Sequence, residues 1–131
     1  MGIERDYLMR QLMMLFEVIQ KILRNRRKGE EEEAEEQISY FYQCLKIDKE
    51  ASEMQINEFV DFLVDKKKLT NEHIELVAIV LKEQGEMEKD ETKQLDYFRK
   101  AYFLLEKVDR ESLSFSMDRQ MKLAELREYL N

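Results

Sequence analysis

The sequence has no proline, no tryptophan and only three glycines among its 131 residues. Proline and glycine mark the tight turns of many-stranded β-proteins and the repeat of collagen, so both classes are excluded. Long apolar runs are lacking as well, because the longest one near the N-terminus covers only residues 12–16. A membrane-spanning helix needs about 20 apolar residues, and a signal peptide needs at least about 7. We therefore expect a helical protein of the cytoplasm.

Cysteine and histidine each occur once. The lone Cys44 cannot form an internal disulfide and fits a reducing compartment. The lone His73 excludes sites that need two imidazoles, including the di-iron bundles with paired Glu-x-x-His motifs. It is expected in the first turn of a helix, where the helix dipole disfavours the charged form that a general base must adopt. The glycines are too dispersed to form a phosphate-binding loop. We therefore expect no catalytic activity, no metal and no cofactor.

Charged residues, by contrast, make up 39% of the chain, with 29 acidic and 22 basic side chains and a net charge of −7. This negative balance disfavours binding to the nucleic-acid backbone. Residues 1–29 carry seven basic and three acidic side chains, which leaves a net charge of −11 on residues 30–131. Gly29 suits the end of one helix, and the six glutamates of residues 30–36 suit the start of the next. Residues 29–36 are therefore predicted to be a solvated acidic junction.

A long N-terminal helix is predicted over residues 6–27 by apolar side chains at steps of four, three, four and three residues. This spacing places them on one stripe of a helix. The stripe consists of Leu8, Leu12, Leu15, Ile19 and Ile22. Further apolar side chains flank it on both sides: Met9, Phe16, Leu23, Tyr7, Met14 and Val18. Because such a helix is apolar around most of its circumference, it needs neighbours on several sides, namely other helices, a second copy or lipid.

Five more helices follow in the pattern of apolar residues and caps. They are predicted over residues 34–47, 53–67, 71–87, 91–108 and 117–130. Ser52 with Gln55 forms the expected capping box of the second of these, and Ser116 caps the last. The predicted fold is all-α, a single domain of residues 1–131. It has an N-terminal helix in residues 1–28, the acidic junction, and a core of antiparallel helical pairs in residues 37–131.

Residues 72–109 resemble the tetratricopeptide helix pair, in which two helices pack antiparallel within about 34 residues. With Ala101 at the small position of the second helix, Phe98 takes its aromatic position and Leu81 the leucine of the first helix. Lys82 replaces the glycine of the pattern, and no proline closes the unit. The resemblance covers about one third of the chain and implies a tetratricopeptide-like fold.

The opening residues 4–10 (ERDYLMR) and the tyrosine-rich residues 97–103 (YFRKAYF) resemble a family of small bacterial proteins classed as a domain of unknown function. This resemblance spans the whole chain. It implies a helical, tetratricopeptide-like fold and no particular activity, ligand or catalytic residue.

Two features are candidates for interaction. The first is the apolar stripe of the N-terminal helix with its basic edge, which fits packing in the core, a homodimer or contact with a membrane. The second is Phe103, which projects toward the charged side of its helix and marks a contact with a partner or with another helix of the chain. The predicted function is a non-catalytic protein–protein interaction module with a protein partner. The alternative is a peripheral membrane protein anchored by its first helix, which the neighbouring glutamates disfavour.

Overall fold

The computed structural model describes residues 2–131, with side chains for residues 5–48 and 50–131. Across these residues the chain forms six α-helices and no β-strand, so the all-α prediction is confirmed. The helices are α1 (Gly2–Arg27), α2 (Glu31–Cys44), α3 (Ile56–Asp61), α4 (Asn71–Met87), α5 (Glu91–Glu111) and α6 (Met117–Leu130). The chain divides into two compact units, one ending at Ala51 and the other spanning Ser52–Asn131. None of the helices in the described part is long and apolar enough to cross a membrane.

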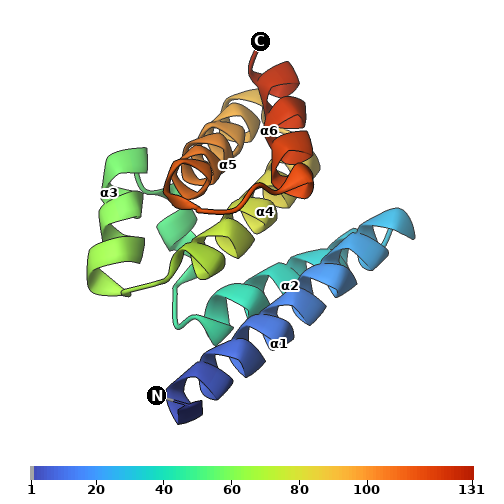
Figure 1. Ribbon diagram of the computed structural model, residues 1–131. Helices are drawn as coiled ribbons and strands as arrows, with labels where there is room; N and C mark the ends of the chain where they lie inside the picture. The colour runs from blue at the N-terminus through green and yellow to red at the C-terminus, as the bar shows by residue number, and fades with distance from the viewer. Residues whose placement is uncertain (1) are drawn as a thin grey trace. The chain divides into compact units, whose positions relative to one another are not determined.

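The first unit is an antiparallel hairpin of α1 and α2 (Figure 1). Gly29 forms the turn between them with a φ of +76°. The amide of Gly29 donates to the carbonyl of Arg26, and the amide of Glu30 donates to the carbonyl of Asn25. These two bonds make a Schellman C-cap, which requires a left-handed residue that glycine adopts at little cost. The prediction that Gly29 ends the first helix is confirmed.

The acidic residues 30–36 are part of the hairpin's second helix. The first turn of α2 contains Glu31, Glu32 and Glu33. The positive end of the helix dipole stabilises carboxylates at this position. For this reason α2 begins three residues before the start predicted from its apolar pattern. One face of α2 is buried through Ala34, Ile38, Phe41 and Tyr42.

The prediction of one continuous helix over residues 53–67, capped by Ser52 and Gln55, is wrong. A short 3₁₀ segment (Lys49–Glu53) comes first, α3 begins at Ile56, and a π-helical turn (Phe62–Lys66) follows it. Gln55 stands at the N-cap of α3 without a side-chain hydrogen bond to the helix. Ser52 is 1% exposed, and its carbonyl accepts a 2.6 Å hydrogen bond from the ammonium of Lys100. Ser52 lies within the 3₁₀ segment, three residues before the N-cap of α3.

The second unit is centred on the antiparallel pair of α4 and α5, with α6 packed along α5 (Figure 1). Local caps set the ends of these helices. Thr70 caps α4, Asp90 accepts from the amides of Thr92 and Lys93, and Ser116 accepts from the amide of Arg119. The predicted starts of α4, α5 and α6 are therefore confirmed. The apolar residues 77–81 of α4 are all buried.

A buried arginine ties the three helices of the second unit together. Arg119 of α6 is 5% exposed and contacts Glu75 of α4 at 2.9 Å and Asp109 of α5 at 3.1 Å. Hydrogen bonds from Arg119 and Gln120 lower the pKa of the Asp109 carboxyl. The buried guanidinium is thus paired with two carboxylates, which supply the opposite charge that a buried arginine requires.

Candidate functional site

The apolar stripe predicted as an interaction surface is only partly accessible in the structure. Leu15, Ile19 and Ile22 are buried, whereas Leu12 is half-buried and Leu8 is 37% exposed. The difference follows from the lengths of the two helices, because α1 has 26 residues and α2 has 14. At 1.5 Å per residue, α1 extends to about 39 Å and α2 to about 21 Å. Since α2 runs back from the C-terminal end of α1, it ends before it reaches Leu8.

A second apolar stripe of α1 lies beside the first and is open to solvent. Met9 is 53% exposed, Met13 is 63% exposed and Phe16 is 52% exposed. Their steps of four and three residues place them on one line along the helix. Leu23 continues this line and is half-buried. We call Met9, Met13 and Phe16 the open face of α1. The sequence predicts Met9, Phe16 and Leu23 as a flank of the first stripe, without Met13, and periodicity alone does not indicate which of the two stripes α2 covers.

Five exposed charged residues run along one edge of the open face: Asp6, Arg10, Glu17, Lys21 and Arg24. Successive steps of four, seven, four and three residues keep them within an arc of about 60° at 100° per residue. Their signs alternate from the negative Asp6 to the positive Lys21, and Arg24 adds a second positive charge at the C-terminal end. The edge is therefore a mixed-charge border rather than a uniformly basic one.

Phe103, the other predicted interaction residue, is 40% exposed on α5. One turn before it is the exposed Arg99, and one turn after it is the half-buried Lys107. The ammonium of Lys107 is held by Glu111 at 3.0 Å. Phe103 is thus a single aromatic side chain in a charged setting, whereas the open face of α1 groups three apolar side chains.

The second unit exposes a further apolar group around the start of α6. It consists of Leu113, Phe115, Met117 and Met121. Met117 and Met121 form one apolar stripe of α6, and the buried residues Leu123 and Leu126 form another. The stripe containing the leucines therefore packs in the second unit, and the methionines face solvent.

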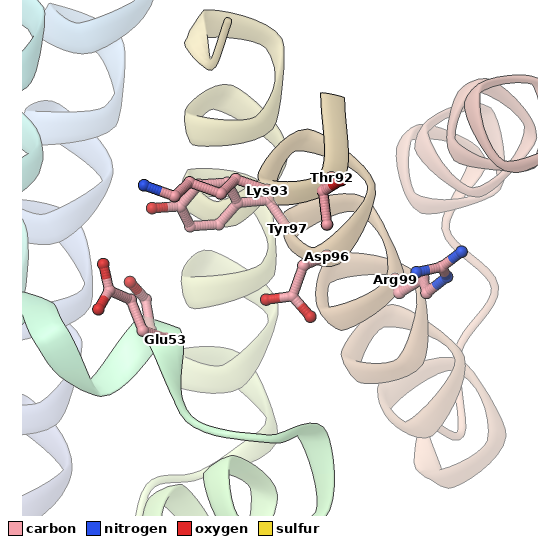
Figure 2. Close-up of a pocket in the computed structure, with 7 residues that line it drawn as sticks. Glu53, Thr92, Lys93, Asp96, Tyr97 and Arg99 are labelled. Atoms are coloured by element: carbon pink, nitrogen blue, oxygen red, sulfur yellow. The ribbon is translucent and has the colours of Figure 1, made fainter. Parts of the chain in front are cut away.

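A pocket of about 440 Å³ lies in the second unit, between the 3₁₀ segment and the first turns of α5 (Figure 2). Its lining includes Glu53, Thr92, Lys93, Asp96, Tyr97 and Arg99. Lys93 and Tyr97, one turn apart on α5, both line the pocket, and Arg99 points away from them (Figure 2). The carboxylate of Asp96 is paired with the ammonium of Lys100 at 2.7 Å. The pocket therefore presents polar groups of both signs, with one of its carboxylates already neutralised.

The titratable groups that line the pocket are one phenol, two carboxylates and two cationic side chains. Burial raises the pKa of the Tyr97 phenol above its usual value near 10, so the phenol is protonated at neutral pH. Neither His73 nor Cys44 lines the pocket. His73 is buried at the start of α4, where its Nδ1 lies 2.7 Å from the Thr70 hydroxyl oxygen and burial lowers its pKa. Within residues 5–48 and 50–131, no group of three or more His, Cys, Asp or Glu side chains is arranged to hold a metal ion.

Comparison with known proteins gives no family model, no curated protein and no solved structure that matches the chain.

Proposed function

We propose that the chain is a non-catalytic protein–protein interaction module of the cytoplasm that binds its partner through the open face of α1. The observation that carries this proposal is the exposure of Met9, Met13 and Phe16 in one line on a helix. Adjacent apolar side chains on a helix surface are the anchors by which helices bind grooves and other helices. Burying them would remove apolar surface from water at about 25 cal/mol per Å².

The helix pair of the second unit also supports the proposal of a protein–protein interaction module. We propose that α4 and α5 form a tetratricopeptide-like pair, in which Phe98 and Ala101 of α5 face Leu81 of α4. All three residues are buried, as the resemblance requires. Tetratricopeptide-like pairs are scaffolds that present surfaces to protein partners. The second unit would then hold a stable framework while the first unit carries the binding surface.

Attachment to a membrane surface is the alternative function. It is favoured by the exposed basic residues Arg24, Arg27 and Lys28 at the end of α1. Against it, Asp6 and Glu17 border the open face, and six glutamates follow the basic cluster within residues 30–36. The glutamates adjoin the basic residues in the sequence, and at separations within a Debye length of about 8–10 Å they offset the attraction of these residues to anionic lipid. A protein partner is therefore the function that these residues support best.

Photocrosslinking in living cells tests the proposal. A benzoylphenylalanine replaces Met13 in the open face, and a matched control replaces Glu35, which is exposed on α2. We expect covalent adducts with protein from position 13 and few or none from position 35. Mass spectrometry of the adducts identifies the captured chain. An absence of protein adducts at position 13, or equal adducts at both positions, contradicts the proposal.

Flotation with anionic vesicles distinguishes the alternative. We expect the full chain to remain in the dense fraction at low and at physiological salt. Capture by the vesicles that falls with salt, and that is lost when Arg24 and Arg27 are reversed to glutamate, would favour the membrane instead.

A further inference from the structure

We propose that the partner of the open face is a second copy of the same chain, with the two α1 helices packed antiparallel about a two-fold axis at the level of residues 14 and 15. This inference rests on the proposed function and names the partner of the same surface. In this arrangement Met13 of each chain lies opposite Phe16 of the other at the centre of the contact. Each α1 would then have α2 of its own chain on one side and the second α1 on another.

The line through the open face has the spacing of a two-helix seam. Met9, Met13, Phe16, Gln20 and Leu23 follow one another at steps of four and three residues, which is the spacing of the core positions in a coiled coil. Met9, Met13 and Phe16 are exposed, while Gln20 and Leu23 are half-buried toward the turn with α2. The seam is therefore most accessible in the N-terminal half of α1, where a second helix can pack on it.

The charged edge of the open face complements itself when the helix is reversed. Along α1 its signs run negative at Asp6, positive at Arg10, negative at Glu17 and positive at both Lys21 and Arg24. In two antiparallel helices the same edges of both helices meet, so the reversed copy presents the opposite order. With Met13 opposite Phe16, Arg10 of one chain lies near Glu17 of the other, and Asp6 lies near Lys21. The two-fold axis makes each of these pairs twice.

A parallel arrangement lacks this match. Parallel helices in register bring the edge residue of one chain close to the residue five positions earlier in the other. Arg10 would then approach Arg5, which is also exposed, and the two Asp6 side chains would stand at the same level of the seam. Like charges at these places disfavour the parallel dimer. The orientation of the dimer is therefore set by the charges, and the apolar face supplies its attraction.

Charge exchange tests the dimer and its register. Sedimentation equilibrium of the full chain should show a dimer. Arg10→Glu or Glu17→Arg alone should raise the dissociation constant of this dimer by roughly tenfold or more, because each reversal creates two like-charge contacts. Arg10→Glu combined with Glu17→Arg restores the opposite pairing and should restore the dimer. Glu35→Arg on α2 is the matched control and should leave the dissociation constant unchanged. Circular dichroism checks that every variant keeps its helices.

A distance between spin labels tests the orientation. In a Cys44→Ser background, a label at Asp6→Cys should lie about 25 Å from its counterpart along an antiparallel pair, since 17 residues at 1.5 Å separate their levels. In a parallel pair the two labels would stand at the same level. A monomeric wild-type chain, a dimer that tolerates both single reversals, or labels at the same level would each overturn the inference. If photocrosslinking at position 13 then captures a different protein, the proposed function stands and only the identity of the partner is wrong.

Discussion

Phe98 and Gly85 fit together so closely that a Cβ added to Gly85 would lie 2.6 Å from Cε1 of the Phe98 ring. The ring is 1% exposed and is stacked on Tyr129, with centroids 4.2 Å apart and planes 8° from parallel. Phe98 is thus held between α4 on one side and α6 on the other. The glycine is needed in α4 because the ring of α5 occupies the place of its side chain.

Gly85→Ala should therefore destabilise the protein, although alanine is the better helix former by about 1 kcal/mol. The added methyl group must displace a ring that has no free side, and such overpacking costs about 1–3 kcal/mol. Urea unfolding followed by circular dichroism measures the change in free energy of unfolding. A second substitution, Phe98→Leu, removes the ring and should make Gly85→Ala nearly neutral in that background. Equal costs in both backgrounds would contradict this contact.

Gly29 and Lys68 both have a left-handed backbone conformation. Replacing Gly29 should lower the free energy of unfolding, whereas introducing glycine at position 68 should raise it. Gly29 has a φ of +76° and open space around its Cα, so Gly29→Ala should cost about 1 kcal/mol from backbone strain alone. Lys68 has a φ of +53° and an exposed side chain, so Lys68→Gly should relieve a similar strain and raise the free energy of unfolding by about 0.5–1 kcal/mol. Thermal unfolding compares the two variants with the wild type. A higher Tm for Gly29→Ala would show that this turn does not need a left-handed residue.

Arg119→Ala should lower the free energy of unfolding by about 2 kcal/mol, because it leaves Glu75 and Asp109 without their cation. Both carboxylates keep some access to water, which limits the cost below that of a fully buried pair. Arg119→Lys keeps the charge but cannot reach both carboxylates with a planar fork, so it should give an intermediate loss. Lys122→Ala, which removes an exposed pair with Asp118, is the matched control and should cost less than about 0.5 kcal/mol. Equal losses for Arg119→Ala and Lys122→Ala would show that the three-helix cluster adds no stability.

His73 should make stability depend on pH in the range just below neutrality. Burial lowers its pKa in the folded protein, while the nearby Glu72 partly opposes this shift. The unfolded chain, with a pKa near 6.5, then binds a proton before the folded chain does. Stability should therefore decrease as the pH falls from about 7 through the folded pKa and level off below it. His73→Gln should flatten this part of the profile in urea titrations at several pH values, and an unchanged slope would contradict the assignment.

The helix ends that the sequence predicted correctly are those fixed by local signals. Thr70, Asp90 and Ser116 each bond to amides two or three residues away, and Gly29 completes a turn within its own neighbourhood. Ser52, predicted as a cap, instead lies in a 3₁₀ segment, and its carbonyl is bound by Lys100, which lies 48 residues further along the chain. No pattern within one helix can reveal such a partner.

The open face of α1 could be predicted as an apolar stripe but not as an exposed one. Two adjacent stripes compete for the same neighbour, and the sequence gives both of them helical spacing. The outcome depends on where α2 begins and ends, and the left-handed residues Gly29 and Lys46 flank its two ends. The candidate surface is therefore a property of the hairpin and not of α1 alone.

The helices that pack most extensively are neighbours along the chain: α1 with α2, α4 with α5, and α5 with α6. Contacts between consecutive elements need little loop closure, and proteins built from them refold in microseconds to milliseconds. Since the sequence has no proline, the slow isomerisation phase of 10–100 s is also absent from the unfolded chain. Stopped-flow dilution from urea should thus return the helical signal without any slow phase. After transient unfolding, each helical hairpin would then re-form faster than a neighbouring unfolded chain can diffuse to it.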